Sequence, residues 1–235
     1  MKTRPVVFLD DGGVISENAQ RGGQWERLVG EFFAPRLGGE PASWAEANRV
    51  VATALFEDFD ALLGADPTYA PFQHRYNRLW LPPMCARVGV PAPPDGQVDD
   101  LFWEAISWIT PRVKADVDGA ADAVRWLRAN EYRLFTASGE DSISLNGYLS
   151  AIGIRDCFGE RLFGPDLLGV VKSGDWFYER LFAESGVAPT DALVIDDSAK
   201  AVGWARQVGA RALHVGSELG GLRDLPAWLL AHPEG

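Results

Sequence analysis

Four apolar residues run directly into two aspartates and two glycines in the stretch "VVFLDDGGVIS", Val6 to Ser16. A short apolar run bounded by charge and glycine is typical of a buried strand in a parallel sheet. Such sheets bind their ligands at the carboxyl ends of the strands. We therefore expect Asp10 and Asp11 to lie at the edge of a sheet where chemistry takes place.

Further short apolar runs occur along the chain, and helical patterns separate them. The runs are Arg133–Thr136, Leu162–Phe163, Ala192–Ile195 and Arg211–Val215. The helical patterns begin near Gly119, Ser142, Trp176 and Ala199. Strands that alternate with helices of this length predict an α/β fold with a doubly wound, Rossmann-like parallel sheet and helices on both faces.

The segment from Asn18 to Thr110 breaks this alternation, because it carries helical patterns and no convincing strand. The patterns cover Trp25–Phe33, Trp44–Leu63, Phe72–Leu81 and Val98–Thr110, with proline-rich breaks at Pro82–Pro83 and Pro91–Pro94. We therefore predict an α/β core domain formed by residues 1–17 and 111–235, and an inserted all-α domain formed by residues 18–110.

The composition of the chain indicates which binding partners and which cellular location to expect. The net charge of −11 argues against binding to nucleic acid or to an anionic membrane, since both would be repelled. No run approaches the roughly 18 apolar residues of a membrane span. The first apolar run is too short for a signal peptide, so we expect a cytoplasmic protein. The two cysteines have no zinc-binding spacing and are expected to be free thiols. The sequence does not indicate an oligomeric state.

Polar residues follow four of the predicted elements at the expected binding edge. They are Asp10–Gly13, Thr136–Ser138, the region of Lys172, and Asp196–Ser198. Three carboxylates that converge there would repel one another without cations. Lys172 supplies one positive charge, and a divalent ion would supply two more. Oxygen ligands of this kind suit Mg²⁺.

These motifs and their order resemble the haloacid dehalogenase (HAD) superfamily, in the branch that has a helical cap between its first and second motifs. The first motif of that family is an apolar strand followed by Asp-x-Asp-Gly, and this chain has Asp10 to Gly13. The second motif matches Leu134 to Thr136, and the third matches Lys172. The fourth, an acidic pair that ends a strand, matches Val194 to Ser198. The resemblance covers nearly the whole chain and implies a HAD-type hydrolase whose residues 18–110 are the cap.

The resemblance implies a role for each motif residue. Asp10 would be the nucleophile that forms a covalent aspartyl intermediate. Thr136 would donate a hydrogen bond to the transferred group, and Lys172 would neutralise that group and the nucleophile. Asp196 and Asp197 would hold Mg²⁺ together with Asp10 and the backbone carbonyl of Gly12. Ser138 and Arg21 are further candidates for substrate binding, although Arg21 can equally be a solvated residue.

Gly12 departs from the family pattern. Phosphatases of the family carry an aspartate there, which protonates the leaving group and then activates water. Reading Asp11 as the nucleophile instead would put Val14 where the motif needs glycine, so we favour Asp10. General acid–base help is worth roughly 10²–10⁴-fold. Without it we expect rates to fall steeply as the leaving group becomes more basic, unless Glu17, Asn18, Arg21 or a cap side chain supplies the proton.

Three functions are compatible with these residues. The leading hypothesis is a Mg²⁺-dependent phosphohydrolase of a small phosphorylated metabolite. The second is a metal-free hydrolase of carbon–halogen bonds, against which the acidic pair argues. The third is a non-catalytic module that binds a ligand. Retention of Asp10, Lys172 and the acidic pair Asp196–Asp197 together argues against this third function.

Overall fold

A four-stranded parallel sheet forms the centre of the computed structural model, which describes residues 4–232. The strands are β1 (Val6–Leu9), β2 (Leu134–Thr136), β3 (Ala192–Asp196) and β4 (Arg211–His214), in the order β2-β1-β3-β4. The chain leaves β1 toward β2 on one side and returns to β3 on the other side. The strand order therefore reverses between β1 and β3, which is where ligands bind in open α/β sheets.

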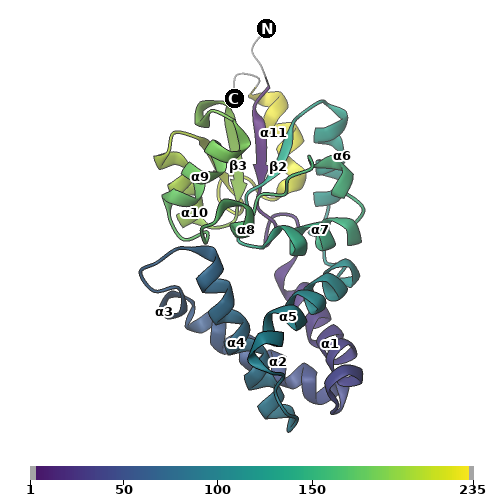
Figure 1. The fold of residues 1–235 in the computed structure, drawn as a ribbon. Coiled ribbons are helices and arrows are strands. Elements are labelled where there is room, and N and C mark those ends of the chain that lie inside the picture. The colour runs from purple at the N-terminus through teal and green to yellow at the C-terminus, as the bar shows by residue number, and fades with distance from the viewer. Residues whose placement is uncertain (1–3, 233–235) are drawn as a thin grey trace.

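Helices cover both faces of the sheet (Figure 1). Because side chains alternate along a strand, Val7 and Leu9 pack into one apolar cluster, whereas Val6 and Phe8 pack into another. The first cluster includes residues of α6 (Ala120–Ala129), α7 (Ser142–Ala151) and α11 (Leu225–Ala231). The second includes residues of α9 (Asp175–Ser185) and α10 (Ala199–Gln207). The doubly wound α/β core predicted from the sequence is confirmed.

One predicted strand is wrong. Leu162–Phe163 forms no strand and lies just before the short helix α8 (Pro165–Leu168). Instead, the carbonyl of Phe163 accepts hydrogen bonds from the Thr136 hydroxyl at 3.1 Å and the Ser138 backbone N–H at 3.4 Å. The segment therefore crosses the end of the edge strand β2 rather than extending the sheet. Single-turn helices lie at Thr110–Arg112, Arg155–Cys157, Pro189–Asp191 and Leu222–Asp224.

Five helices follow β1 and form the cap, at the opposite end of the molecule from α11 (Figure 1). They are α1 (Asn18–Leu37), α2 (Pro41–Glu57), α3 (Phe59–Leu63), α4 (Tyr69–Val88) and α5 (Asp95–Ile109). A separate apolar cluster holds α1, α2, α4 and α5 together, with Phe33 stacked on Trp44 at its centre. An all-α cap inserted into the α/β core is therefore present, and we propose residues 18–110 as its extent.

Two local predictions in the cap are corrected. Helix α4 continues through Pro82 and Pro83, whereas the sequence predicts a break there. Each proline removes one helical hydrogen bond, but Leu81 and Met84 on either side are fully buried and hold the helix in place by packing. The single helix predicted over Trp44–Leu63 is divided at Asp58 into α2 and α3.

The cap also contacts the core beside the predicted third motif. Thr68 pairs with Val170 in an isolated antiparallel bridge. The Tyr69 N–H donates to the Gly169 carbonyl at 3.0 Å, and the Val171 N–H donates to the Pro67 carbonyl at 2.8 Å. This short ladder fixes the backbone immediately before Lys172. Within residues 4–232, no helix combines the length and the apolar character needed to cross a membrane.

Candidate active site

The loop after β1 places Asp10 and Asp11 in different surroundings. The Asp10 N–H donates to the Ile195 carbonyl at 3.0 Å, so Asp10 continues the pairing of β1 with β3. The Asp11 carbonyl then accepts hydrogen bonds from three successive backbone N–H groups, those of residues 14–16. This tight turn carries the chain away from the sheet toward α1.

Gly13 is required by this turn. Its φ of +73° lies in the left-handed region that favours glycine. A Cβ at this position would also overlap the carboxylate of Asp197. The absence of a side chain at residue 13 therefore lets Asp197 lie directly against the loop that carries Asp10.

Lys172 joins the nucleophile candidate to the acidic pair. Its Nζ lies 3.0 Å from Oδ1 of Asp10 and 2.7 Å from Oδ2 of Asp196. The Tyr178 hydroxyl donates to the same Asp196 oxygen at 3.1 Å, and the Ser198 N–H donates to the other at 2.9 Å. Asp196 is thus fixed from three sides and holds Lys172 beside Asp10.

Burial and the closeness of the carboxylates to one another shift the pKa values of the site residues. Burial raises the pKa of Asp10 to about 6; the charge of Lys172 opposes this shift and that of Asp196 adds to it. Burial and the charge of Asp196 also hold the pKa of Asp197 above its usual range. Burial disfavours the charge of Lys172, but Asp10 and the other anionic neighbours outweigh it and raise its pKa. One ammonium therefore incompletely neutralises three carboxylates.

The donor set fits a divalent cation. Asp10, Asp196 and Asp197 each offer a carboxylate oxygen, and these oxygens lie within 4.8 Å of one another. All-oxygen ligands suit a hard ion such as Mg²⁺, and a divalent charge would offset the repulsion that remains beside Lys172. Asp197 is exposed, so the group of three is open to solvent on its side.

The second predicted motif lies next to β1, but the hydroxyl of Thr136 makes a different contact from the one expected. Thr136 is opposite Leu9 in the sheet register and is fully buried. Its hydroxyl donates to the Phe163 carbonyl, and no hydrogen bond within residues 4–232 links it to Asp10, Lys172 or Asp196. The Ser138 hydroxyl accepts a bond from the Glu140 N–H at 3.2 Å. The structure therefore brings Asp10, Lys172 and Asp196 into direct contact, with Asp197 close by, and leaves Thr136 outside that group.

Gly12 does not need glycine for its backbone conformation, since it is not among the residues with positive φ. A Cβ at this position would lie 2.9 Å from Oδ1 of Asn18, which is the tip of an exposed side chain. A side chain at position 12, where the family's phosphatases carry an aspartate, would therefore meet the carboxamide of Asn18. Glu17 does not take over the missing role, because its carboxylate caps α1 by accepting from the Ala19 and Gln20 N–H groups.

Asp11 and Arg21 form a second charged group beside the same loop. Asp11 is completely buried, accepts a hydrogen bond from the Ser16 hydroxyl at 2.8 Å and forms an ion pair with Arg21. Arg21 also contacts Glu140, with Nη1 and Oε1 3.0 Å apart, and its guanidinium lies 4.3 Å from the ring centroid of Tyr148. Arg21 is therefore engaged by residues of the core rather than exposed to solvent.

Sequence reasoning missed Tyr178 and Glu140. Tyr178 lies in "WFYERLF", a pattern that predicts an amphipathic helix in which the aromatic residues serve for packing. Its position six residues after Lys172 was the available signal, because it allows both to reach Asp196. Glu140 lies four residues after Thr136, yet a charged residue in a loop is normally expected to be solvated. Its partner Arg21 is 119 residues away, so nothing local marks it.

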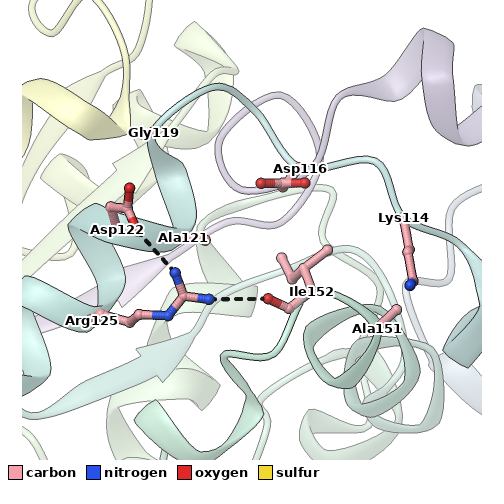
Figure 2. A pocket seen from close by; sticks show the side chains of 8 residues that line it. All are labelled: Lys114, Asp116, Gly119, Ala121, Asp122, Arg125, Ala151 and Ile152. Atoms are coloured by element: carbon pink, nitrogen blue, oxygen red, sulfur yellow. Dashed lines mark hydrogen bonds and ion pairs between the residues drawn. The ribbon is translucent and has the colours of Figure 1, made fainter.

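A hollow of about 200 Å³ lies elsewhere on the core, at the start of α6 (Figure 2). It is lined by two basic side chains, Lys114 and Arg125, and by two acidic ones, Asp116 and Asp122. Figure 2 shows Arg125 bonded to Asp122 and to the carbonyl of Ile152, at 2.9 and 3.4 Å. None of the residues predicted to be catalytic lines it, so it does not compete with the carboxylate group as the active site.

Comparison of the sequence with family models supports the class that this geometry suggests. The model of the haloacid dehalogenase-like hydrolases matches residues 42–209, which is more than half of the chain. The protein therefore belongs to this family of hydrolases. A comparison with curated protein sequences found no match.

Solved structures share the fold over nearly the whole length. An L-2-haloacid dehalogenase from Xanthobacter autotrophicus is 16% identical, with a TM-score of 0.62, and the match covers 97% of this chain and 99% of that one. The HAD hydrolase YfnB from Bacillus subtilis, solved with magnesium bound, is 14% identical with a TM-score of 0.64 and the same coverage. A HAD phosphatase from Thermococcus onnurineus is 17% identical with a TM-score of 0.60, over 96% and 97% of the two chains.

Proposed function

We propose that this hydrolase is a Mg²⁺-dependent phosphohydrolase that acts on a small phosphorylated metabolite through an aspartyl-phosphate on Asp10. The observation that carries the proposal is the contact of one lysine with two of three clustered carboxylates. A displacement that expels halide gains little from a divalent cation beside its nucleophile, whereas phosphoryl transfer depends on such neutralisation.

Each residue of the cluster has a role that its contacts support. Asp10 attacks phosphorus, and Lys172 holds the nucleophile and balances the incoming negative charge. Asp196 and Asp197, with Asp10 and the Gly12 carbonyl, would hold Mg²⁺. The chemistry that bound Mg²⁺ supplies is stabilisation of negative charge on the phosphoryl oxygens.

The residues around the cluster divide into binding and support. The hydroxyl hydrogen of Thr136 is used by the Phe163 carbonyl, so its proposed contact with the phosphoryl group requires the hydroxyl to turn. Ser138 uses its hydroxyl oxygen only as an acceptor, which supports it as a donor to substrate. Since the guanidinium of Arg21 is held by two carboxylates, we propose that it positions them rather than binds substrate alone.

Gly12 favours a second candidate function, the hydrolysis of carbon–halogen bonds. A halide leaves without a proton, so an enzyme that expels it has no use for a carboxyl at position 12. In this case Asp10 would form an alkyl ester, and the acidic pair would have no metal to hold.

A substrate screen separates the two functions. The protein is assayed with aryl phosphates, alkyl phosphates and 2-haloacids, each with Mg²⁺ and with a chelator, and Asp10→Asn is the matched control. We expect phosphate release that requires Mg²⁺ and Asp10. Halide release that persists in the chelator, without phosphate release, would replace the proposal with the second function.

A further inference from the structure

The site contains a carboxyl group that the proposed reaction has not yet used. Phosphoryl transfer to Asp10 leaves an alkoxide unless a proton is delivered, and Gly12 carries no donor. Asp11 cannot deliver it, because Ser16 and Arg21 occupy its two carboxylate oxygens in the buried interior. Glu17 is used to cap α1. Apart from the proposed metal ligands, Glu140 is a further carboxyl of the described residues near this loop, held by the same Arg21 that pairs with Asp11.

The backbone of Glu140 is held next to Lys172. Its N–H donates to the Ser138 hydroxyl, and a Cβ on Gly164 would overlap its carbonyl, so that glycine packs directly against it. A Cβ on the neighbouring Gly139 would lie 4.0 Å from the Cβ of Lys172. The loop from β2 to α7 therefore runs along the lysine that contacts the nucleophile.

The side chain of Glu140 is also positioned. Arg21 binds one of its oxygens at 3.0 Å and is itself anchored by the buried Asp11 and by the ring of Tyr148. With 39% of its side chain exposed, Glu140 remains accessible, whereas Asp11 is completely enclosed. A carboxyl that is held on one side and open on the other can exchange protons with a bound substrate.

Charged and titratable neighbours from three elements act on Glu140. Partial removal of its carboxyl from water raises its pKa to about 7; Arg21 opposes this shift, and the carboxylates of Asp11, Asp141 and Asp10 add to it. Glu140 in turn disfavours ionisation of the cap phenols Tyr69 and Tyr76 and of Tyr148 on α7. Asp10 is thus among the charged groups that act on Glu140. A group that titrates near neutral pH is suited to both giving and taking a proton.

We propose that Glu140 is the general acid and base of this enzyme and replaces the aspartate that the family's phosphatases carry at the position of Gly12. The proposal rests on the phosphohydrolase function proposed above. Arg21 and Asp11 are positioning residues that orient the Glu140 carboxyl.

The reaction balances in two steps. In the first, a carboxylate oxygen of Asp10 bonds to phosphorus, the bond from phosphorus to the leaving oxygen breaks, and Glu140 gives its proton to that oxygen. In the second, Glu140 takes a proton from water as the water oxygen bonds to phosphorus. The bond between phosphorus and Asp10 breaks, which releases inorganic phosphate and returns Glu140 to its acid form.

The experiment compares Glu140→Gln with the wild-type protein on two substrates, 2,4-dinitrophenyl phosphate and an alkyl phosphate. The first leaving group needs no proton, and the second does. We expect kcat/KM for the alkyl phosphate to fall about 10²-fold or more in the variant, while kcat/KM for the aryl phosphate stays nearly unchanged. The variant should also release a burst of dinitrophenolate, because water attack on the aspartyl-phosphate has lost its base.

Two controls keep the result interpretable. Glu17→Gln alters a nearby carboxylate that caps a helix, and its ratio of aryl to alkyl activity should equal that of the wild type. In the wild type alone, kcat/KM for the alkyl phosphate should fall above about pH 7 as Glu140 loses its proton. The same fall should be absent with the aryl phosphate, so the test does not depend on the variant folding.

The outcomes separate the two proposals. If the wild type with Mg²⁺ hydrolyses neither phosphate, the proposed function fails and the role of Glu140 fails with it. If the wild type is active but the two substrates share one pH profile and respond equally to Glu140→Gln, only the role of Glu140 is overturned. Equal loss on both substrates would show a structural residue.

Discussion

Asp10 and Asp11 are adjacent in the chain, yet their carboxylates lie in opposite electrostatic situations. Asp11 is completely buried and fully matched, with Arg21 and the Ser16 hydroxyl on its two oxygens. Asp10 is nearly as buried, at 8% exposed, but it shares its one cation with Asp196. Burial alone therefore does not distinguish a structural carboxylate from a functional one.

The difference lies in what each region lacks. The Asp11 region is complete, since an ion pair and a hydrogen bond satisfy the buried charge. The Asp10 region keeps uncompensated negative charge, which a divalent cation can offset. A buried charge that the protein leaves unmatched marks the place where a ligand is expected.

The largest expected effect is on turnover. Asp10→Asn should lower kcat by more than about 10⁴-fold, as loss of a nucleophile does in other covalent enzymes. Its free energy of unfolding should not fall, because the raised pKa of Asp10 means that its ionised form is already disfavoured in the fold. Activity assays and denaturant titration measure the two quantities. A variant confirmed by mass spectrometry as still amidated that keeps most of the activity would refute the assignment.

Asp11→Asn should give the converse result. Removing one partner of a buried ion pair leaves a charge without compensation, so we expect the free energy of unfolding to fall by about 3 kcal/mol. Turnover per folded molecule should fall far less than in Asp10→Asn. Arg21→Met is the matched control, and the double variant should lose less than the sum of the two single losses. Strict additivity would mean that the pair does not contribute as described.

Binding of Mg²⁺ should stabilise the protein independently of any assay of activity. A ligand that binds only the folded state at about 100-fold over its Kd adds about 2.7 kcal/mol. Thermal unfolding with and without Mg²⁺ measures this gain. Asp197→Asn should reduce the gain and Asp11→Asn should keep it. An unfolding curve that Mg²⁺ does not move would count against the metal site.

The smallest effect concerns pH. The pKa of Glu140 is raised from 4.5 to about 7 in the folded protein. Between these values the folded state holds a proton that the unfolded state has released, so this group makes the protein less stable as pH rises through that window. Glu140→Gln removes the contribution. The Tm of the variant relative to the wild type should therefore increase from about pH 5 to about pH 8, and a constant difference would contradict the shifted pKa.

The sequence predicted the four strands of the core well because each is a short, largely apolar run. Asp10, Asp196 and Asp197 could be predicted to converge, since β1 and β3 are parallel and bring their carboxyl ends to one edge; Lys172 follows no strand and was expected there from the family resemblance. The apolar pair Leu162–Phe163 was misread, because two apolar residues carry no period that separates a strand from a crossing loop. Pro82 and Pro83 were misread because packing of the cap, rather than local propensity, maintains α4.

The contacts of the site beyond the motifs could not be predicted. Glu140 and Arg21 meet across 119 positions of sequence, so their partnership depends on how the cap lies on the core. The bond from Thr136 to Phe163 depends in turn on a segment that was itself misassigned. What the sequence cannot provide is the matching of charges across distant segments, and that matching is what separates Asp10 from Asp11.

The most direct test of this account is to identify the residue that becomes phosphorylated. The enzyme is mixed with Mg²⁺ and 2,4-dinitrophenyl phosphate, quenched in acid during turnover, and digested for fragmentation by mass spectrometry. We predict a phosphoryl group on Asp10, with Asp11 unmodified in the same peptide. A phosphoryl group on Asp11, or steady turnover with neither residue ever labelled, would contradict the account.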